Sequence, residues 1–196
     1  MDPITLNPQT TALVLIDLQQ GIAGNPTEPR PGPEVVKNAV RLADRLRELG
    51  GTVILVHVDF HDPKERLNVQ VDAPAWNTSG QMPANWSEIV PELGPREGDV
   101  VITKRQWGAF YGTDLDLQLR RRGIKTIVLG GISTNYGCES TARDAYERGY
   151  EQVFVEDAMA SRSADAHAFT FQNIFPRIGR VRSTEEVLEA LLRAKE

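Results

Sequence analysis

Residues 11–17 read Thr-Ala-Leu-Val-Leu-Ile-Asp, an unbroken apolar run that ends on a carboxylate. Short apolar runs of the same kind return at 52–58, 100–103, 126–131, 152–156 and, more weakly, 179–181. Strands that read as continuous hydrophobic runs are covered on both faces, which is typical of parallel sheets. The sequence therefore predicts a mainly parallel sheet of about six strands, with 11–16 as its first.

Amphipathic segments alternate with these strands. After the first strand, apolar positions from Pro33 onward form one helical stripe, which Gly50-Gly51 ends. Further helices are expected at 114–123, from residue 138 to 149, at 161–174 and at 184–194, the last opening with a capping-box spacing. Alternation of this kind implies right-handed crossovers, so the predicted fold class is an α/β three-layer, doubly wound, Rossmann-like sandwich. We expect a single domain over 1–196.

The stretch 63–98 departs from this alternation. It is rich in proline, contains Trp76 and Trp86, and has no strong periodicity. Irregular segments of that length in a compact domain are usually lids or interface elements. We therefore expect a long excursion above the sheet, which we call the excursion.

Composition narrows the class of partner. The 196 residues carry 27 acidic and 22 basic side chains, a formal charge of -5, and no basic run longer than 120–122. This balance argues against a nucleic acid or an anionic membrane and favours a small molecule. The longest apolar run, 12–16, is far too short to span a membrane, and the N-terminus lacks the features of a secretory signal, so a cytoplasmic location is expected.

Candidate chemistry lies where the predicted strands end, because ligands of open parallel sheets bind beyond those ends. Asp17 ends the first strand, Lys104 ends the third, and the fourth leads through 132–138 to a helix that carries Cys138, the single cysteine. A lysine and a helix N-terminus both favour an anion, so a thiol there has a lowered pKa, and Asp17 is placed to take its proton. The alternative is a structural ion pair beside a core cysteine.

At these residues the sequence resembles the isochorismatase-like cysteine hydrolases. The match covers nearly the whole chain, through 15–19, 103–104 with 108–110, 131–135 with 139–145, and 156–158. Amidase members of that family, which include nicotinamidases, carbamoylsarcosine amidases and ureidoacrylate amidases, use an Asp, Lys, Cys triad. The resemblance implies that Asp17 is the acid or base, that Lys104 stabilises charge, and that Cys138 is the candidate nucleophile.

The thiol comes one residue late for that family. Amidase members write Gly-Ile-Ala-Thr-Asn-x-Cys-Val-Glu-Ser-Thr where residues 131–141 read Gly-Ile-Ser-Thr-Asn-Tyr-Gly-Cys-Glu-Ser-Thr, so Gly137 occupies the nucleophile's position. One residue near a helix start turns a side chain by about 100°, which directs Cys138 into the helix packing unless the backbone adjusts. Isochorismatases resemble this chain in having a glycine there, and they hydrolyse a vinyl ether without a thiol, with the aspartate as proton donor. Residues 133–135 differ from theirs, which argues against isochorismate as substrate.

The resemblance also implies a cis peptide bond between Ile132 and Ser133, which aims the N–H groups of Ser133 and of residue 137 or 138 into an oxyanion hole. The site residues beyond these are expected to be substrate-binding, namely Gln19, Trp107, Phe110 and Tyr136, with Trp76 or Trp86 from the excursion. Arg105 is placed to pair with an acidic substrate, the alternative being a solvated arginine.

No cofactor and no metal are expected. Asp59 and His61 resemble a nicotinamidase metal motif, but the chain has no further histidine before His167 to complete an inner-sphere site. Because family members are usually dimers or larger, a homo-oligomer is expected. Three functions stay open: thiol-dependent C–N hydrolysis through Cys138, thiol-independent hydrolysis with Asp17 as the acid, and a binding or scaffold protein that keeps the pocket without turnover.

Overall fold

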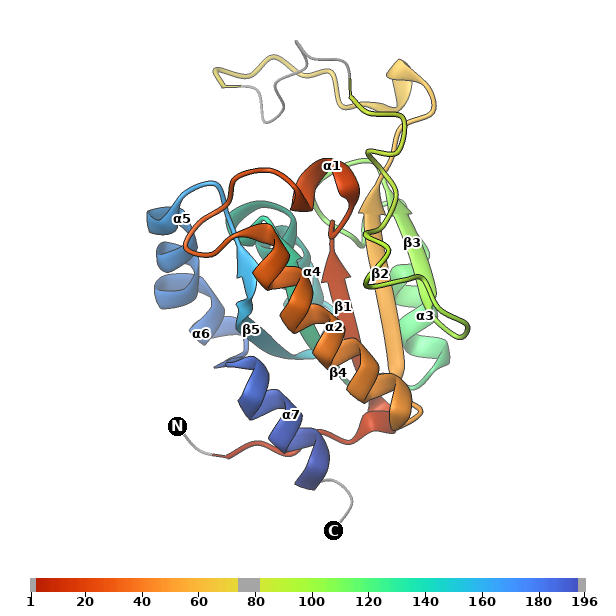
Figure 1. The fold of residues 1–196 in the computed structure, drawn as a ribbon, viewed down its shortest axis with the longest axis vertical. Helices are drawn as coiled ribbons and strands as arrows, with labels where there is room; N and C mark the ends of the chain where they lie inside the picture. Colours follow the sequence, from red (N-terminus) through yellow and green to blue (C-terminus); the bar gives the residue numbers. More distant parts are fainter. Residues whose placement is uncertain (1–2, 74–81, 194–196) are drawn as a thin grey trace.

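The computed structural model describes residues 3–73 and 82–193. Within them, one sheet runs in the order β3-β2-β1-β4-β5-β6, and every neighbouring pair is parallel (Figure 1). The strands are β1 Thr11–Ile16, β2 Thr52–Val58, β3 Val100–Lys104, β4 Thr126–Ile132, β5 Glu151–Ala160 and β6 Arg180–Arg182. This order confirms the predicted doubly wound, parallel sheet.

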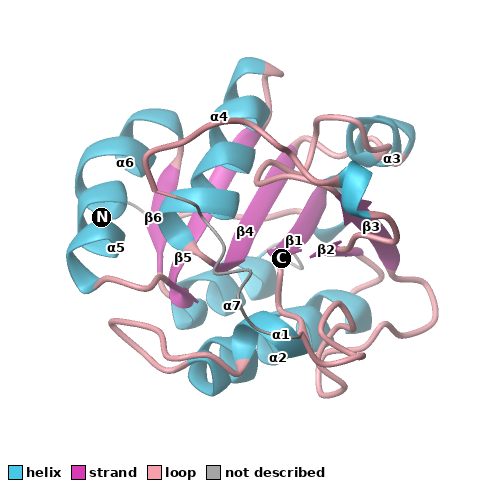
Figure 2. Cartoon of the chain, turned by 90° about the horizontal axis from the view of Figure 1, so that it is seen from above, coloured by secondary structure: helices cyan, strands magenta, loops and turns pink. Residues whose placement is uncertain are grey.

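Helices cover both faces of the sheet (Figure 2). Helices α1 Gln20–Ala23, α2 Gly32–Glu48 and α7 Thr184–Arg193 lie on one side. On the other side lie α3 Leu115–Arg121, α4 Glu139–Glu147, α5 Ala164–Phe169 and α6 Phe175–Ile178. The three-layer architecture is thus confirmed. No helix in the described part of the chain is both long and apolar enough to cross a bilayer.

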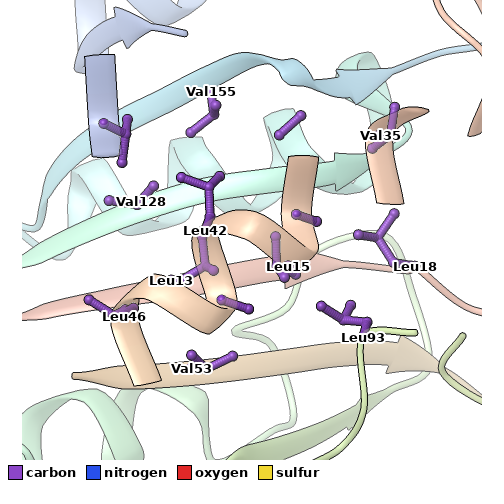
Figure 3. Packing of buried hydrophobic residues seen from close by; sticks show 14 of the residues in the cluster. Leu13, Leu15, Leu18, Val35, Leu42, Leu46, Val53, Leu93, Val128 and Val155 are labelled. Carbon is purple, nitrogen blue, oxygen red and sulfur yellow. The ribbon is translucent and has the colours of Figure 1, made fainter. Parts of the chain in front are cut away.

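Burial on both faces explains why β1 reads as a continuous apolar run. Leu13 and Leu15 pack with the α2 side chains Leu42 and Leu46 in one core (Figure 3), and the intervening residues of β1 belong to the core on the opposite face. Alternate residues of a strand point to opposite faces, so both sets must be apolar. The first strand was predictable for this reason.

Two elements differ by more than two residues from their predicted extents. Strand β5 continues beyond residue 156, because a register shift against β4 accommodates Glu156 and Asp157. The Asp157 carboxylate accepts a hydrogen bond from the Thr184 N–H (2.7 Å) at the start of α7. In place of the helix predicted at 161–174 the chain forms α5 and a π-helical turn at 170–174, and α6 extends beyond the predicted end. Pro176, in the first turn of α6, has no N–H for an unbroken α-helical ladder.

The excursion rises from the end of β2 and comes back down beside α1 and β2 (Figure 1). Its described part has one short 3-10 turn, Pro63–Glu65. On the return, the Trp86 carbonyl accepts from the Gly21 N–H (2.8 Å), and Val90 donates to the Leu18 carbonyl (3.0 Å). The excursion is therefore anchored beside the carboxyl end of β1. Trp76 lies outside the described residues.

Candidate active site

Asp17 follows β1 at the point where the strand order reverses. Strands β2 and β3 lie to one side of β1 and β4 lies to the other, and such switch points are where open α/β sheets bind ligands. Asp17 has a φ of 53°, which is uncommon for a residue other than glycine. Its N–H donates to the Val56 carbonyl (2.8 Å), which fixes this backbone turn. The strained conformation places the carboxylate at the edge of the sheet.

Lys104, the last residue of β3, meets that carboxylate. Its Nζ donates to Asp17 Oδ2 (2.9 Å) and to the carbonyls of Gln106 (3.0 Å) and Trp107 (2.7 Å). The three ammonium protons therefore each have an acceptor, although the side chain is buried. The sequence prediction that Asp17 and Lys104 lie together at this edge is confirmed.

The Asp17 carboxyl favours its protonated form more than an ordinary aspartate does. Burial raises its pKa, and this effect exceeds the opposing influence of Lys104 and, more weakly, of His57. Oδ2 is occupied by Lys104, while Oδ1 is buried and has no hydrogen-bond partner within the described residues. A proton is thus best accommodated on Oδ1.

The turn after β4 brings Gly137 against this pair. The Ile132–Ser133 peptide bond is cis, as predicted. A β-carbon placed on Gly137 would lie 3.4 Å from Asp17 Oδ2, 3.2 Å from the Trp107 carbonyl oxygen and 3.0 Å from Ile16 Cγ2. Residue 137 therefore faces the carboxylate, and the glycine leaves that space without a side chain.

Cys138 points the other way. Its thiol has no exposed surface, belongs to the core on the α4 side, and lies 3.9 Å from the Gly130 carbonyl oxygen. Burial, followed by the charge of Asp17, raises the thiol pKa, so the thiolate is disfavoured. The sulfur thus packs in the core, as the rotation of about 100° per residue predicts, and the role of Cys138 as nucleophile stays a prediction.

Two aromatic side chains stand at the rim of the site. The rings of Trp107 and Tyr136 meet edge to face with their centroids 4.9 Å apart, and the two residues are 45% and 39% exposed. The Trp107 carbonyl binds Lys104 Nζ, and Tyr136 immediately precedes Gly137. Their positions fit the predicted role in lining a pocket.

Gln19 and Phe110, for which the same role was predicted, are buried. Gln19 is fully buried, and its amide accepts from the Val58 N–H (2.9 Å) and donates to the carbonyls of Val58 (3.0 Å) and Trp86 (3.2 Å). It therefore ties β1, β2 and the excursion together. Phe110 is 4% exposed and stacks on Tyr150 in the core.

Asp59 and His61 remain a pair without a third partner. His61 Nε2 lies 3.6 Å from Asp59 Oδ2 at the surface, and the described ranges contain no group of three or more His, Cys, Asp or Glu residues that could hold a metal ion. His57 binds through both ring nitrogens, to the Ser87 carbonyl (2.7 Å) and to Thr103 Oγ1 (2.8 Å).

The sequence gives no sign of the position of His167. The side chain is buried, and its Nδ1 lies 2.7 Å from Thr134 Oγ1 in the turn that carries Gly137. Burial, with a smaller contribution from Arg30, lowers its pKa to about 4, so the imidazole is neutral at pH 7. No spacing in the sequence links residues 134 and 167.

The chain is similar in sequence and in fold to known proteins. The chain matches the isochorismatase domain model over residues 11–186. It is 54% identical to the isochorismatase family protein YwoC of Bacillus subtilis, over 96% of this chain and 98% of that protein. It is 32% identical to the ureidoacrylate amidohydrolase RutB of Agrobacterium fabrum, over 80% of this chain and 78% of that enzyme. A solved isochorismatase family structure from Burkholderia thailandensis has a TM-score of 0.91 at 47% identity, covering 97% of this chain and 100% of that chain.

Proposed function

Because the chain belongs to the isochorismatase family, we propose that it is a hydrolase of a small polar metabolite that uses Asp17 as a general acid and needs no thiol. One observation carries the proposal. The residue that faces the Asp17 carboxylate is Gly137, whereas the Cys138 thiol is enclosed in the core. The site thus presents an acid and an ammonium, without a nucleophilic side chain between them.

In this mechanism the proton on Asp17 Oδ1 passes to the substrate. With a vinyl ether, the proton adds to the double-bond carbon, and the resulting oxocarbenium ion is attacked by water. The attacking water returns a proton to the Asp17 carboxylate, and the hemiacetal so formed breaks its C–O bond as its hydroxyl proton passes to the departing oxygen, giving a carbonyl compound and an alcohol. Lys104 stays on Oδ2 and stabilises the carboxylate that remains after proton transfer (2.9 Å).

The turn after β4 supplies the groups we assign to substrate oxygen. The N–H groups of Tyr136 and Cys138 both donate to the Ser133 carbonyl at 3.2 Å. The sequence left open whether residue 137 or residue 138 supplies an N–H group to the oxyanion hole. Because the Cys138 N–H is already used, we assign this role to Gly137, together with Ser133. Trp107 and Tyr136 would then flank the bound molecule.

Amide hydrolysis is the second candidate, favoured by the 32% identity to the ureidoacrylate amidohydrolase RutB. This mechanism requires the Cys138 thiol to leave the core. A variant of Cys138 therefore distinguishes amide hydrolysis from thiol-independent acid catalysis. We expect Cys138→Ala to keep wild-type turnover within about twofold, because the thiol is buried in the core and takes no part in acid catalysis. The variant should lose about 1–2 kcal/mol of unfolding free energy through the small cavity. Steady-state kinetics on a panel of enol ethers and amides, with urea unfolding, measures both.

Gly137→Ala is the matched control next to it. The added methyl group would enter the space before Asp17 Oδ2 and should lower turnover by about 10²-fold, while Cys138 stays untouched. Loss of activity in folded Cys138→Ala would refute the thiol-independent mechanism. If the panel shows no turnover while small acids raise the melting temperature, the protein is a binding member of the family.

We further propose that the chain forms a homodimer or larger homo-oligomer through the excursion. Leu67, Val69 and Val71 alternate along it and are 73%, 68% and 58% exposed. We expect side chains at every second position to share one apolar edge where the backbone is extended. We expect light scattering to give a multiple of the monomer mass and Val69→Asp to reduce it, whereas Asn68→Asp, which adds the same charge on the other side, should not. A monomeric wild-type chain would contradict this.

A further inference from the structure

Arg105 lies at the rim of the Asp17–Lys104 site. It directly follows Lys104, and the next two carbonyls, of Gln106 and Trp107, fold back to accept from Lys104 Nζ at 3.0 and 2.7 Å. The backbone from 104 to 107 is therefore a tight loop around the buried ammonium. Consecutive Cα atoms are about 3.8 Å apart, so Arg105 begins at the same edge of the sheet as the candidate acid.

The Arg105 guanidinium forms an ion pair through Nε, whereas its Nη1 has no partner among the described residues. Nε lies 3.3 Å from Glu65 Oε2 in the first turn of the excursion, and the side chain is 32% exposed. Nη1 is buried and has no partner in the described part of the molecule. One of its donors is thus withdrawn from solvent without an acceptor, although about a third of the side chain is exposed.

The neighbouring carboxylate does not fill this gap. Asp59, at the end of the adjacent strand, accepts from the Phe60 N–H (2.8 Å) through Oδ1 and faces His61 through Oδ2 at 3.6 Å. Among described residues, Glu65 is the carboxylate within ion-pair distance of Arg105. Glu65 also accepts from the His61 N–H (2.7 Å), which fixes it in place. One N–H edge of a permanently charged group therefore still lacks an acceptor.

Such an arrangement is costly unless another molecule completes it. A buried donor without a partner costs about 1–3 kcal/mol, and more when it is charged. Arginine cannot relieve that cost by losing its proton, because a guanidinium stays charged in proteins. The planar fork of a guanidinium matches the two oxygens of a carboxylate better than it matches any neutral group.

We propose that Arg105 binds a carboxylate of the substrate, with its Nη1 edge, and so restricts this site to acids. The location of the bound molecule rests on the proposed function, but the binding itself does not require turnover. Glu65 orients the guanidinium from the excursion side, and Asp17 acts on the part of the molecule that lies against Gly137. An acid is thereby distinguished from the corresponding amide by one charge-assisted contact at the rim.

The test is equilibrium binding by calorimetry, using two probe pairs that differ in charge alone: crotonate against crotonamide, and benzoate against benzamide. We expect the wild-type chain to bind at least one acid about tenfold or more tightly than its amide. Arg105→Gln should remove that preference, and Arg105→Lys should keep part of it, because the charge remains without the fork. Urea unfolding confirms that the variants are folded.

Arg66→Gln is the matched control. Arg66 belongs to the same part of the excursion, but its guanidinium lies over the Phe60 ring at 5.1 Å and is expected not to contact the acid. Equal loss in Arg66→Gln, a preference retained in Arg105→Gln, or no acid binding at all would each overturn the assignment. If acids bind through Arg105 while no enol ether or amide is turned over, the hydrolytic proposal fails and this inference stands.

Discussion

Asp17→Asn is expected to lower turnover by about 10²–10⁴-fold, the range that general acid catalysis contributes. Asparagine has nearly the same shape, and its amide oxygen can still accept from Lys104 Nζ, as Oδ2 does at 2.9 Å. It has no transferable proton at the position of Oδ1. Because the packing is kept, the loss should appear in kcat more than in KM, and steady-state kinetics with the preferred substrate measures it.

The pH profiles of the wild-type protein and of Asp17→Asn test the direction of proton transfer. Burial raises the Asp17 pKa, and the acid form exists below that pKa. The wild-type kcat/KM should therefore fall as pH rises through it, and the residual activity of Asp17→Asn should lack this limb. A thiolate nucleophile gives the opposite sign, since activity would rise with pH. A rising profile, or full activity in Asp17→Asn, would contradict acid catalysis.

Lys104→Met is expected to give the largest loss of stability, about 3–5 kcal/mol, because removal of one partner of a buried pair leaves an uncompensated charge. Asp17 would stay buried without its cation, and the carbonyls of Gln106 and Trp107 would lose their donor. Urea unfolding at pH 8 measures the loss. At pH 5 the loss should be smaller, since Asp17, whose pKa is already raised by burial, can then take up a proton.

Two further variants test whether the loss of stability comes from the unpaired charge of Asp17. The double variant Asp17→Asn with Lys104→Met should be more stable than Lys104→Met alone, because no charge is left unpaired. Arg143→Met removes an exposed ion pair with Glu139 (3.0 Å) and should cost less than about 1 kcal/mol. An equal loss in Lys104→Met at both pH values, with no recovery in the double variant, would show that the pair is not electrostatically coupled.

The sheet could be predicted because its residues obey local rules. Residues 11–16 and 52–58 became β1 and β2 with the predicted bounds, since strands covered on both faces must be apolar throughout. Strand β5 was predicted too short, because Glu156 and Asp157 interrupt the apolar run where the ladder shifts register. Its continuation depends on pairing with β4, which no local pattern reveals.

The site could be predicted in part for a similar reason. Asp17 and Lys104 end parallel strands, and topology alone brings such residues to one edge. The burial of Gln19 and Phe110 could not be predicted, because contacts with Val58, Trp86 and Tyr150 come from distant segments. The pairing of Thr134 with His167 was missed for the same reason.

The glycine at 137 has a consequence for how this scaffold can change over time. A side chain at this position would lie beside the Asp17 carboxylate and the Lys104 ammonium, which are held at the ends of two strands. Its β-carbon would be 3.4 Å from Asp17 Oδ2. Exchange of that residue, with small shifts of Ile16 and of the Trp107 carbonyl, which lie 3.0 and 3.2 Å from the added carbon, would therefore add or withdraw a covalent step. Divergent chemistries within one lineage could then be separated by a very short mutational path.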